Sequence, residues 1–284
     1  MVSERGLRLL AFQMKNIYRR RYGGRFRVLP LCILMGFIFP AIIQAQSSSP
    51  PLATLLEKLG KQVESFRQQY PAVTCSEAVS QVKLAKGGGV VRRLESQFDY
   101  LILISPGENY LAVEESRLIK KPSAKRNDVP LLVTGGFSTM ILVFHPLYQN
   151  CFEYLQLPEE SIGGKRVVCI QFQHVPGTRS TACLRLNGRD VPLELKGKAW
   201  IDPETMAFIR ITAELASPLT DLGLQTLTAD VQYAPVRFDG AESAYWLPTS
   251  ALIEVATAQQ HWRNIHRFTD YRRFSVTTQS SVKR

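Results

Sequence analysis

The sequence predicts a mainly β protein of the α+β class, built as a curled antiparallel sheet or an incomplete β-barrel. An N-terminal helix and a short apolar lid or plug helix complete the expected fold. The clearest evidence lies in residues 195–215, where odd positions are apolar and even positions are mostly polar around the turn Asp202-Pro203-Glu204-Thr205. Such alternation is typical of a half-buried hairpin. Ten or more segments of this kind follow one another, and a sheet of that size must curl or close to hide its edges.

The N-terminus predicts a secretory signal peptide over residues 1–45. A basic segment, residues 1–28, is followed by the apolar run Val28–Ile43 and by Ala45, a small residue at a plausible cleavage point. We therefore expect an exported protein, periplasmic or otherwise outside the cytoplasm, with residues 46–284 as its single domain. An uncleaved N-terminal anchor is the alternative, less favoured because the apolar run is about 16 residues long, below the roughly 20 that span a bilayer.

The charge of the chain resides mainly in this leader. The net charge is +11, and residues 1–28 hold eight basic side chains against one acidic side chain. The 239 residues after Ala45 carry only +4, which does not indicate a nucleic-acid partner. Four arginines near the C-terminus are expected to form a solvated face that protects a sheet edge; they are Arg263, Arg267, Arg272 and Arg273.

The elements expected after the leader begin with an amphipathic helix over 52–70, whose leucines follow helical spacing and which Pro71 ends. The tripeptide Gly87-Gly88-Gly89 joins two strands and predicts a turn rather than a phosphate loop, because no helix follows it. The loop 120–128 is basic and is interpreted as solvated surface. Strands are expected over 73–84, 90–104, 110–119, 151–155, 166–174, 182–186, 225–237, 245–257 and 262–277, besides the hairpin of 195–215.

A second, very apolar helix is expected over 137–144, with Ser138 or Thr134 as its N-cap. Its apolar stripe comprises Phe137, Met140, Ile141 and Phe144. Eight residues cannot span a membrane. The segment is therefore either a lid or plug over the open face of the sheet, or an ordinary core helix.

Four cysteines follow the leader, and their pairing stays open. Cys169 and Cys183 flank the turn 175–178 and would face each other if that turn closed a hairpin. Cys75 and Cys151 would then form a second bridge. The alternative is that each cysteine is a small buried apolar residue.

No catalytic or metal motif is evident. The segment 136–140 resembles the G-x-S-x-G nucleophile elbow but lacks the second glycine. His261 and His266 would lie on opposite faces of a strand, which is a poor geometry for a shared metal. His145 and His174 are expected to be structural or solvent-facing. The sequence thus predicts a protein that is not an enzyme, with no cofactor and no metal.

Three features together carry a resemblance to a known family. They are the exported N-terminus with its amphipathic helix, the hairpin Gly197–Thr205 that continues into Phe208–Ile211, and the closing segment Tyr271–Val276. The chain resembles envelope proteins of the LolA/LolB type, the outer-membrane lipoprotein-carrier fold that RseB-like sensors also use. The resemblance implies an incomplete antiparallel barrel around a helical lid, with an apolar cavity. No functional residue of that family is transferred to this chain.

Large aromatic side chains extend the expected ligand site. Trp200 and Phe208 are predicted to lie near each other on the otherwise polar face of their hairpin. Trp246 and Trp262 add apolar surface on neighbouring strands. The candidate ligand-contact residues are Phe137, Met140, Ile141, Phe144, Trp200, Phe208, Trp246 and Trp262.

The predicted function is non-catalytic binding of a hydrophobic ligand in the half-barrel: a lipid, an acyl chain or a lipidated protein. Burial yields roughly 0.8 kcal/mol per methylene, so an apolar cavity needs no polar motif. The protein would be peripheral to a membrane at most. The alternatives are a protein–protein sensor or scaffold that binds an envelope partner and, less favoured, an exported hydrolase. A continuous apolar concavity favours the first function, a filled core the second, and a polar cleft with convergent titratable groups the third.

Overall fold

A computed structural model describes the chain over residues 10–12, 50–69, 73–106, 111–120, 136–186, 189–239 and 244–273. Nearly all of the predicted signal peptide, most of the predicted basic loop and the final residues of the last predicted strand lie outside these ranges. Among the described residues, no helix is both long enough and apolar enough to cross a membrane.

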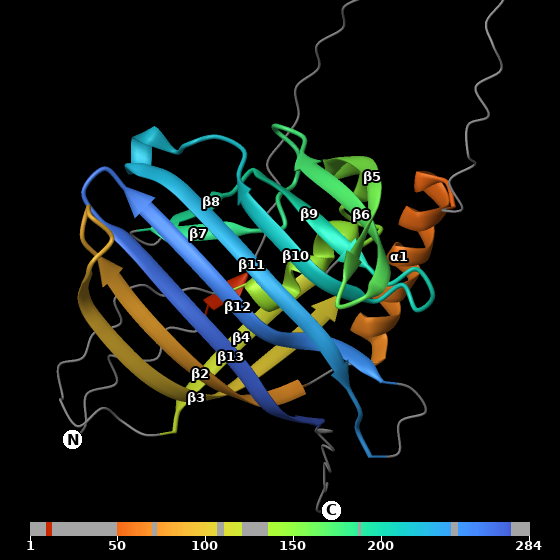
Figure 1. The fold of residues 1–284 in the computed structure, drawn as a ribbon, viewed down its shortest axis with the longest axis horizontal. Coiled ribbons are helices and arrows are strands. Elements are labelled where there is room, and N and C mark those ends of the chain that lie inside the picture. Colours follow the sequence, from red (N-terminus) through yellow and green to blue (C-terminus); the bar gives the residue numbers. More distant parts are fainter. Residues whose placement is uncertain are drawn as a thin grey trace, which may run out of the picture.

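One large antiparallel sheet dominates the structure (Figure 1). Its ten main strands are ordered β4-β3-β2-β13-β12-β11-β10-β9-β6-β5, and the three-residue β1 (Leu10–Phe12) pairs with β4 at one edge. The strands are β2 (Val73–Leu84), β3 (Val90–Pro106), β4 (Leu111–Ile119), β5 (Phe152–Ile162), β6 (Lys165–His174), β9 (Leu195–Ile201), β10 (Phe208–Leu215), β11 (Leu224–Val236), β12 (Tyr245–Thr257) and β13 (His261–Arg273). The sheet curls without closing, as the sequence predicts.

The C-terminal strand β13 lies in the interior of the sheet, between β12 and β2. The expectation that its arginines protect an edge is therefore wrong. Arg263 instead forms an ion pair with Glu254 of β12, and Arg267 is exposed on a central strand. The edges are formed by β5 and by β4 with its partner β1.

The helix α1 (Leu52–Gln69) lies at one end of the sheet (Figure 1). Leu55, Leu59 and Val63 are fully buried at helical spacing, while the intervening charged residues face solvent. Gly60 lies on the buried side, where an added Cβ would meet the Gln149 side chain at 2.9 Å. A glycine in the middle of α1 therefore permits close packing against the segment after η1.

The predicted second helix forms as η1 (Phe137–Phe144), but as a 3₁₀ helix. It lies on the inner side of the curl and contacts α1, β10, β11 and β12. Met140 to Phe144 are all buried in the main hydrophobic core. Two further 3₁₀ turns, η2 (Gln149–Cys151) and η3 (Thr220–Leu222), connect strands.

A β-bulge changes the hairpin of β9 and β10 from the predicted pattern. Phe208 pairs with Ile201 and Arg210 pairs with Trp200, so the register shifts between Phe208 and Arg210. The extra residue puts Phe208 and Ile209 on the faces opposite to those predicted, and the predicted alternation resumes at Ile211. Phe208 points into the main core, whereas Trp200 and Ile209 lie together on the outer face. The prediction that Trp200 and Phe208 are neighbours on one face is thus wrong.

The cysteines are not bridged as the sequence analysis considered. Cys75, Cys151 and Cys169 are buried free thiols. The turn after β6 does not close a hairpin with Cys183, because β6 pairs with β5 and β9. The strand β7 (Cys183–Leu186) instead pairs with β8 (Arg189–Pro192) in a separate two-stranded sheet.

Candidate functional site: the inner face and the plug helix

The inner face of the sheet has an apolar half, and η1 fills it. The Phe144 ring lies 5.1 Å from the Phe208 ring and 6.0 Å, edge-on, from the Phe172 ring, measured between centroids. Ile170 of β6 and Ile211 of β10 are fully buried in the same core. We call η1 the plug helix, because its side chains occupy the concavity that the curled strands form.

Seven of the eight predicted ligand-contact residues belong to the main hydrophobic core or pack against it. Met140, Ile141, Phe144 and Phe208 are buried members of the main core, and Phe137, Trp246 and Trp262 pack against it partly buried. Trp200 is the exception. It covers Val167 and Cys169 on the outer face, where its indole Nε1 donates a hydrogen bond of 2.7 Å to Glu160.

The C-terminal end of the plug helix is fixed by side chains from neighbouring elements. The Tyr154 hydroxyl of β5 donates a 2.6 Å hydrogen bond to the Val143 carbonyl. The Gln149 amide donates to the Phe144 carbonyl at 2.9 Å and to the Leu56 carbonyl of α1 at 2.8 Å. The bonds to Val143 and Phe144 satisfy carbonyls that the end of the plug helix leaves without an intrahelical partner, and the bond to Leu56 ties this end to α1.

His145 adds a hydrogen-bonding contact beside them. Its Nε2 lies 2.7 Å from a carboxylate oxygen of Glu64 in α1, and the imidazole is almost fully buried. His174 is buried too, with Nε2 3.1 Å from the Arg179 carbonyl. Both histidines therefore have structural roles, as expected for residues outside any catalytic motif.

The N-terminal end of the plug helix is held by a carboxylate instead of a local cap. Gly136 is the N-cap, with φ +80°, and as a glycine it supplies no side-chain cap. Glu115 of β4 accepts a 2.8 Å hydrogen bond from the Gly136 N–H. The predicted caps differ from this arrangement: Thr134 lies outside the described residues, and Ser138 follows the cap that the structure uses.

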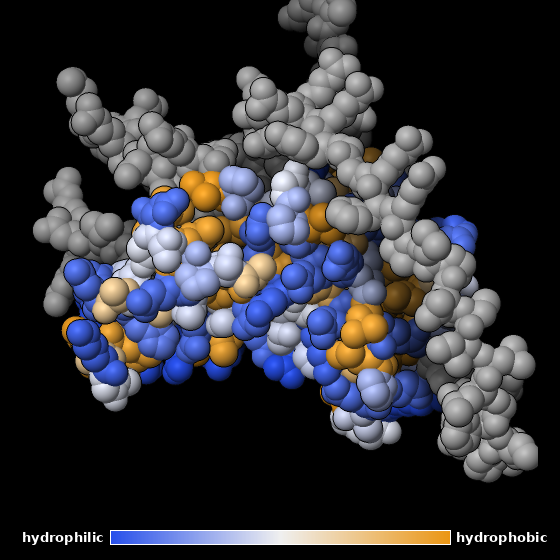
Figure 2. Space-filling view, turned by 90° about the horizontal axis from the view of Figure 1, so that it is seen from above, coloured by the Kyte–Doolittle hydropathy of each residue, from blue (hydrophilic) through white to orange (hydrophobic). Residues whose placement is uncertain are grey.

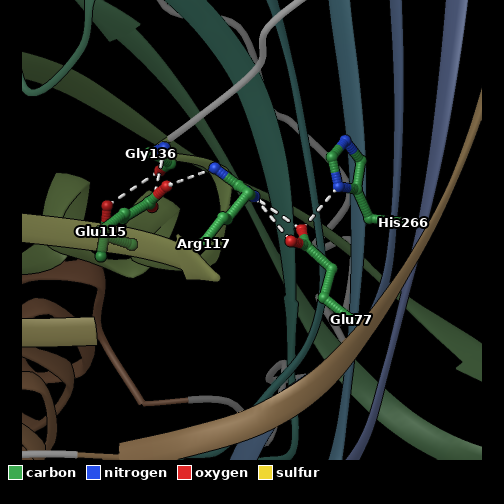
Figure 3. Close-up of polar contacts among 6 residues, drawn as sticks. Glu77, Glu115, Arg117, Gly136 and His266 are labelled. Atoms are coloured by element: carbon green, nitrogen blue, oxygen red, sulfur yellow. Dashed lines mark hydrogen bonds and ion pairs between the residues drawn. The ribbon is translucent and has the colours of Figure 1, made fainter. Parts of the chain in front are cut away.

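Glu115 is the first member of a buried polar chain that crosses the inner face (Figure 3). An Arg117 Nη lies 3.6 Å from Glu115, and the same guanidinium binds both oxygens of Glu77 at 2.6 and 3.0 Å. His266 Nδ1 lies 2.7 Å from Glu77. The chain thus links β4, β2 and β13 to the first residue of the plug helix, and we call it the Glu115–His266 network.

The Glu115–His266 network is strongly buried: the Glu77 side chain is 0% exposed and the His266 side chain 4%. Burial alone acts to raise the pKa of Glu77, but the hydrogen bond from His266 and the charge of Arg117 outweigh it and lower that pKa. Glu77 is therefore a carboxylate at neutral pH. Its two partners account for its buried charge.

Sequence reasoning missed this network, although one signal was present. Val73, Cys75, Glu77 and Val79 are the inward positions of β2, so a lone acid interrupts an apolar row. A buried charge in such a row requires a partner on another strand. Which strand supplies it depends on the sheet order, and that order is not evident from local alternation.

The outer face carries a shallow groove of about 630 Å³ over β9 to β12. Its charged groups are ion-paired: Lys196 with Glu214 at 3.2 Å inside the groove, and Asp230 with Arg210 beside it through a hydrogen bond of 2.9 Å. The space-filling view shows a face of the described part that is largely hydrophilic, with separate hydrophobic patches (Figure 2). Among the described residues, no three His, Cys, Asp or Glu side chains converge as metal ligands would.

Comparisons with known proteins show likeness only to solved structures. No family model matches the chain, and no curated protein does. A DUF1329 family protein from Desulfovibrio piger is 10% identical with a TM-score of 0.45, covering 81% of this chain and 96% of that one. A LolA superfamily protein from Nitrosomonas europaea is 12% identical with a TM-score of 0.40, covering 78% and 94%.

A putative outer-membrane lipoprotein-sorting domain from Vibrio parahaemolyticus is 10% identical with a TM-score of 0.41, covering 78% of this chain and 95% of that one. The names of these structural neighbours include the LolA superfamily, the family that the sequence resembles. The likeness is one of fold.

Proposed function

We propose that this protein is a non-catalytic binder of an apolar ligand, namely a lipid or the acyl chain of a lipidated protein. The ligand would occupy the inner face of the curled sheet in place of the plug helix. The observation that carries this proposal is the plug helix itself: a largely apolar segment fills the concavity, and polar contacts hold its two ends.

The helix type supports displacement. A 3₁₀ helix has poorer hydrogen-bond geometry than an α-helix, and runs beyond three or four residues are uncommon. The plug helix extends over eight residues. Its backbone therefore contributes little to its own stability, and its position depends on side-chain packing and on the contacts at its ends.

The energies of exchange are comparable. Burying about 14 methylenes of an acyl chain yields roughly 11 kcal/mol, at about 0.8 kcal/mol each. Re-exposing the five side chains from Met140 to Phe144 costs roughly 8–15 kcal/mol, at about 1.5–3 kcal/mol each. Because the two amounts are comparable, burial of the acyl chain would offset the cost of displacing the plug helix.

The N-terminal leader supports an exported location for this activity. Its basic segment, apolar run and small residue at position 45 have the order of a secretory signal. We propose that residues 46–284 act as a single domain in the cell envelope, where lipid and lipidated protein are the apolar ligands at hand.

A second candidate is a sensor or scaffold that binds an envelope protein on the same fold. The filled core favours it, because the inner face in this conformation presents packed side chains. The two functions differ in one respect: the carrier requires the plug helix to leave the inner face, and the scaffold does not.

Photo-crosslinking distinguishes the two functions. The exported protein is incubated with vesicles that contain a phospholipid bearing a diazirine in mid-chain, irradiated, and digested for peptide mass spectrometry. Crosslinks on Phe172, Phe208 or Ile211 are expected, together with faster hydrogen exchange at 137–144. Crosslinks confined to outer residues such as Leu252, with the plug helix still protected, would contradict the carrier.

A further inference from the structure

We infer that the turn between β2 and β3 is a docking surface for an anionic lipid bilayer. This surface goes beyond the proposed function, because it lies away from the inner face and would operate whatever the cavity holds. In Figure 1 the turn lies at the far end of the sheet from α1. We call residues 83–93 the basic hairpin tip.

The basic hairpin tip is a well-formed turn that stands clear of the protein. The Ala85 N–H donates to the Gly89 carbonyl at 2.8 Å, and the Gly88 N–H donates to the Ala85 carbonyl at 2.9 Å. Gly88 has φ +82°, and a Cβ added at Gly87, Gly88 or Gly89 would meet no atom within 4 Å. Among the described residues, the Cβ positions of these three glycines are therefore open.

Two consecutive valines make the hairpin tip apolar. Val90 is 57% exposed and Val91 is 62% exposed. Successive residues of a strand point to opposite faces, so in a packed sheet one of the two would be covered. Both are exposed, which means that the hairpin tip projects on both faces. Single exposed apolar residues are common on protein surfaces. Two adjacent ones at a projecting turn can insert their side chains into the apolar layer of a bilayer.

Four cations surround the valines. They are Lys83, Lys86, Arg92 and Arg93, and no acidic residue occurs between Ala78 and Leu94. The nearest acid along β3, Glu95, accepts a hydrogen bond from Ser80 and lies 4.0 Å from Arg93. The hairpin tip therefore carries a strong local excess of positive charge beside the two exposed valines.

This combination fits an anionic membrane better than it fits an acidic protein. Each basic residue near an anionic lipid surface strengthens binding several-fold, and the attraction decays within a Debye length. An inserted valine pair needs a fluid apolar layer beneath the charges, and a bilayer supplies one.

Vesicle binding tests the inference. The protein is purified from the envelope with the N-terminus it carries there, and cosedimented with vesicles of phosphatidylcholine alone or with one quarter phosphatidylglycerol. Lys86→Gln with Arg92→Gln should lower the partition coefficient on the anionic vesicles by about 30-fold. Val90→Ser with Val91→Ser should lower it about tenfold, with little dependence on salt.

A matched charge control is available on α1. Lys58→Gln with Lys61→Gln removes the same charge from an exposed helix, and this double variant should bind anionic vesicles within about twofold of the parent. Because each variant retains the same N-terminus as the parent, any contribution of the leader cancels. Thermal unfolding of each variant shows that the fold is retained.

Insertion is read directly from Gly87→Cys labelled with the fluorophore NBD, a site where a side chain meets no neighbour. A blue shift on anionic vesicles, quenched by doxyl lipids, is expected. Three results would each overturn the inference: no binding by the parent protein, an equal loss in the α1 control, or no NBD shift with vesicles. An equal shift with soluble polyphosphate would identify a polyanion site instead of a bilayer site.

Discussion

Gly197 of β9 has no Cβ, and this lets β10 and the Phe172 ring pack directly against its backbone. An added Cβ would lie 2.0 Å from the Thr212 carbonyl oxygen and 2.6 Å from a ring carbon of Phe172. We expect Gly197→Ala to destabilise the protein by about 1–3 kcal/mol or more, because backbone must move to relieve the overlap. Urea unfolding measures the loss.

Gly87→Ala is the matched control for this substitution, since its Cβ meets nothing within 4 Å. It should leave the urea midpoint unchanged or raise it slightly, because alanine restricts the unfolded chain. Equal midpoints for the two variants would show that the close approach at Gly197 is not what limits substitution there.

Glu77 makes the stability of the protein depend on pH. Its folded-state pKa lies below the unfolded-state value of about 4.3, so its ionised form stabilises the fold at neutral pH. That contribution is lost as the pH falls through the folded-state pKa. Glu77→Gln should therefore destabilise the protein by about 3 kcal/mol at pH 7, because Arg117 is left buried beside a neutral group.

The same variant should lose less additional stability than the parent between pH 5 and pH 2.5, measured by urea unfolding at each pH. Glu204→Gln, in an exposed turn, is the control and should follow the parent curve. If Glu77→Gln and the parent lose stability in parallel through this range, Glu77 is not the source of the acid sensitivity.

At the scale of the element, the plug helix offers a direct test of its fixed C-terminal end. Tyr154→Phe removes the hydroxyl that donates to the Val143 carbonyl. We expect faster hydrogen exchange over 137–144 and a loss of about 1–3 kcal/mol, because a partly buried carbonyl loses its donor. Exchange mass spectrometry and urea unfolding measure the two effects.

Tyr233→Phe removes a hydroxyl from the same core, but one that makes no hydrogen bond to the described residues. The Tyr233 hydroxyl is nonetheless buried. Removing it should leave stability unchanged or increase it, because an unsatisfied polar group is costly to bury. A loss equal to that of Tyr154→Phe would contradict the assigned hydrogen bonding.

Elements defined by local alternation could be predicted well. The bounds 73–84 and 245–257 agree with β2 and β12, and 137–144 agrees with the plug helix. The hairpin of β9 and β10 was harder, because a bulge between Phe208 and Arg210 puts Phe208 on the inner face and Ile209 on the outer face, while Ile211 again follows the predicted pattern. A bulge of this kind has no fixed residue signature, so the inward position of Phe208 was not predicted.

In the candidate site, too, the parts that depend on local spacing could be predicted and the parts that depend on long-range pairing could not. The apolar stripe of Phe137, Met140, Ile141 and Phe144 is visible in the sequence, because helical spacing is a local property. The Glu115–His266 network is not visible, because Glu77 and His266 are 189 positions apart and meet only through sheet order. Long-range pairing decides such contacts, and a single sequence does not encode it in a readable pattern.

At the scale of the whole molecule, the strand order predicts where stability concentrates. β13 is paired on both sides, with β12 and with β2, whereas β5 pairs only with β6. We expect the slowest hydrogen exchange in β13 and its two neighbours, and faster exchange in β5, because edge strands open more readily. Protection of β5 equal to that of β13 would contradict this order.

The central position of β13 also governs when the chain can fold. β2 is among the first strands to leave the ribosome and β13 is the last, yet β2 and β12 each have an open edge until β13 arrives. The middle of the sheet is therefore assembled only after almost the whole chain has been synthesised. Until β13 arrives, the strands β2 to β4 and the strands β9 to β12 have no shared strand to join them, so the continuous sheet is the last part of the fold to form.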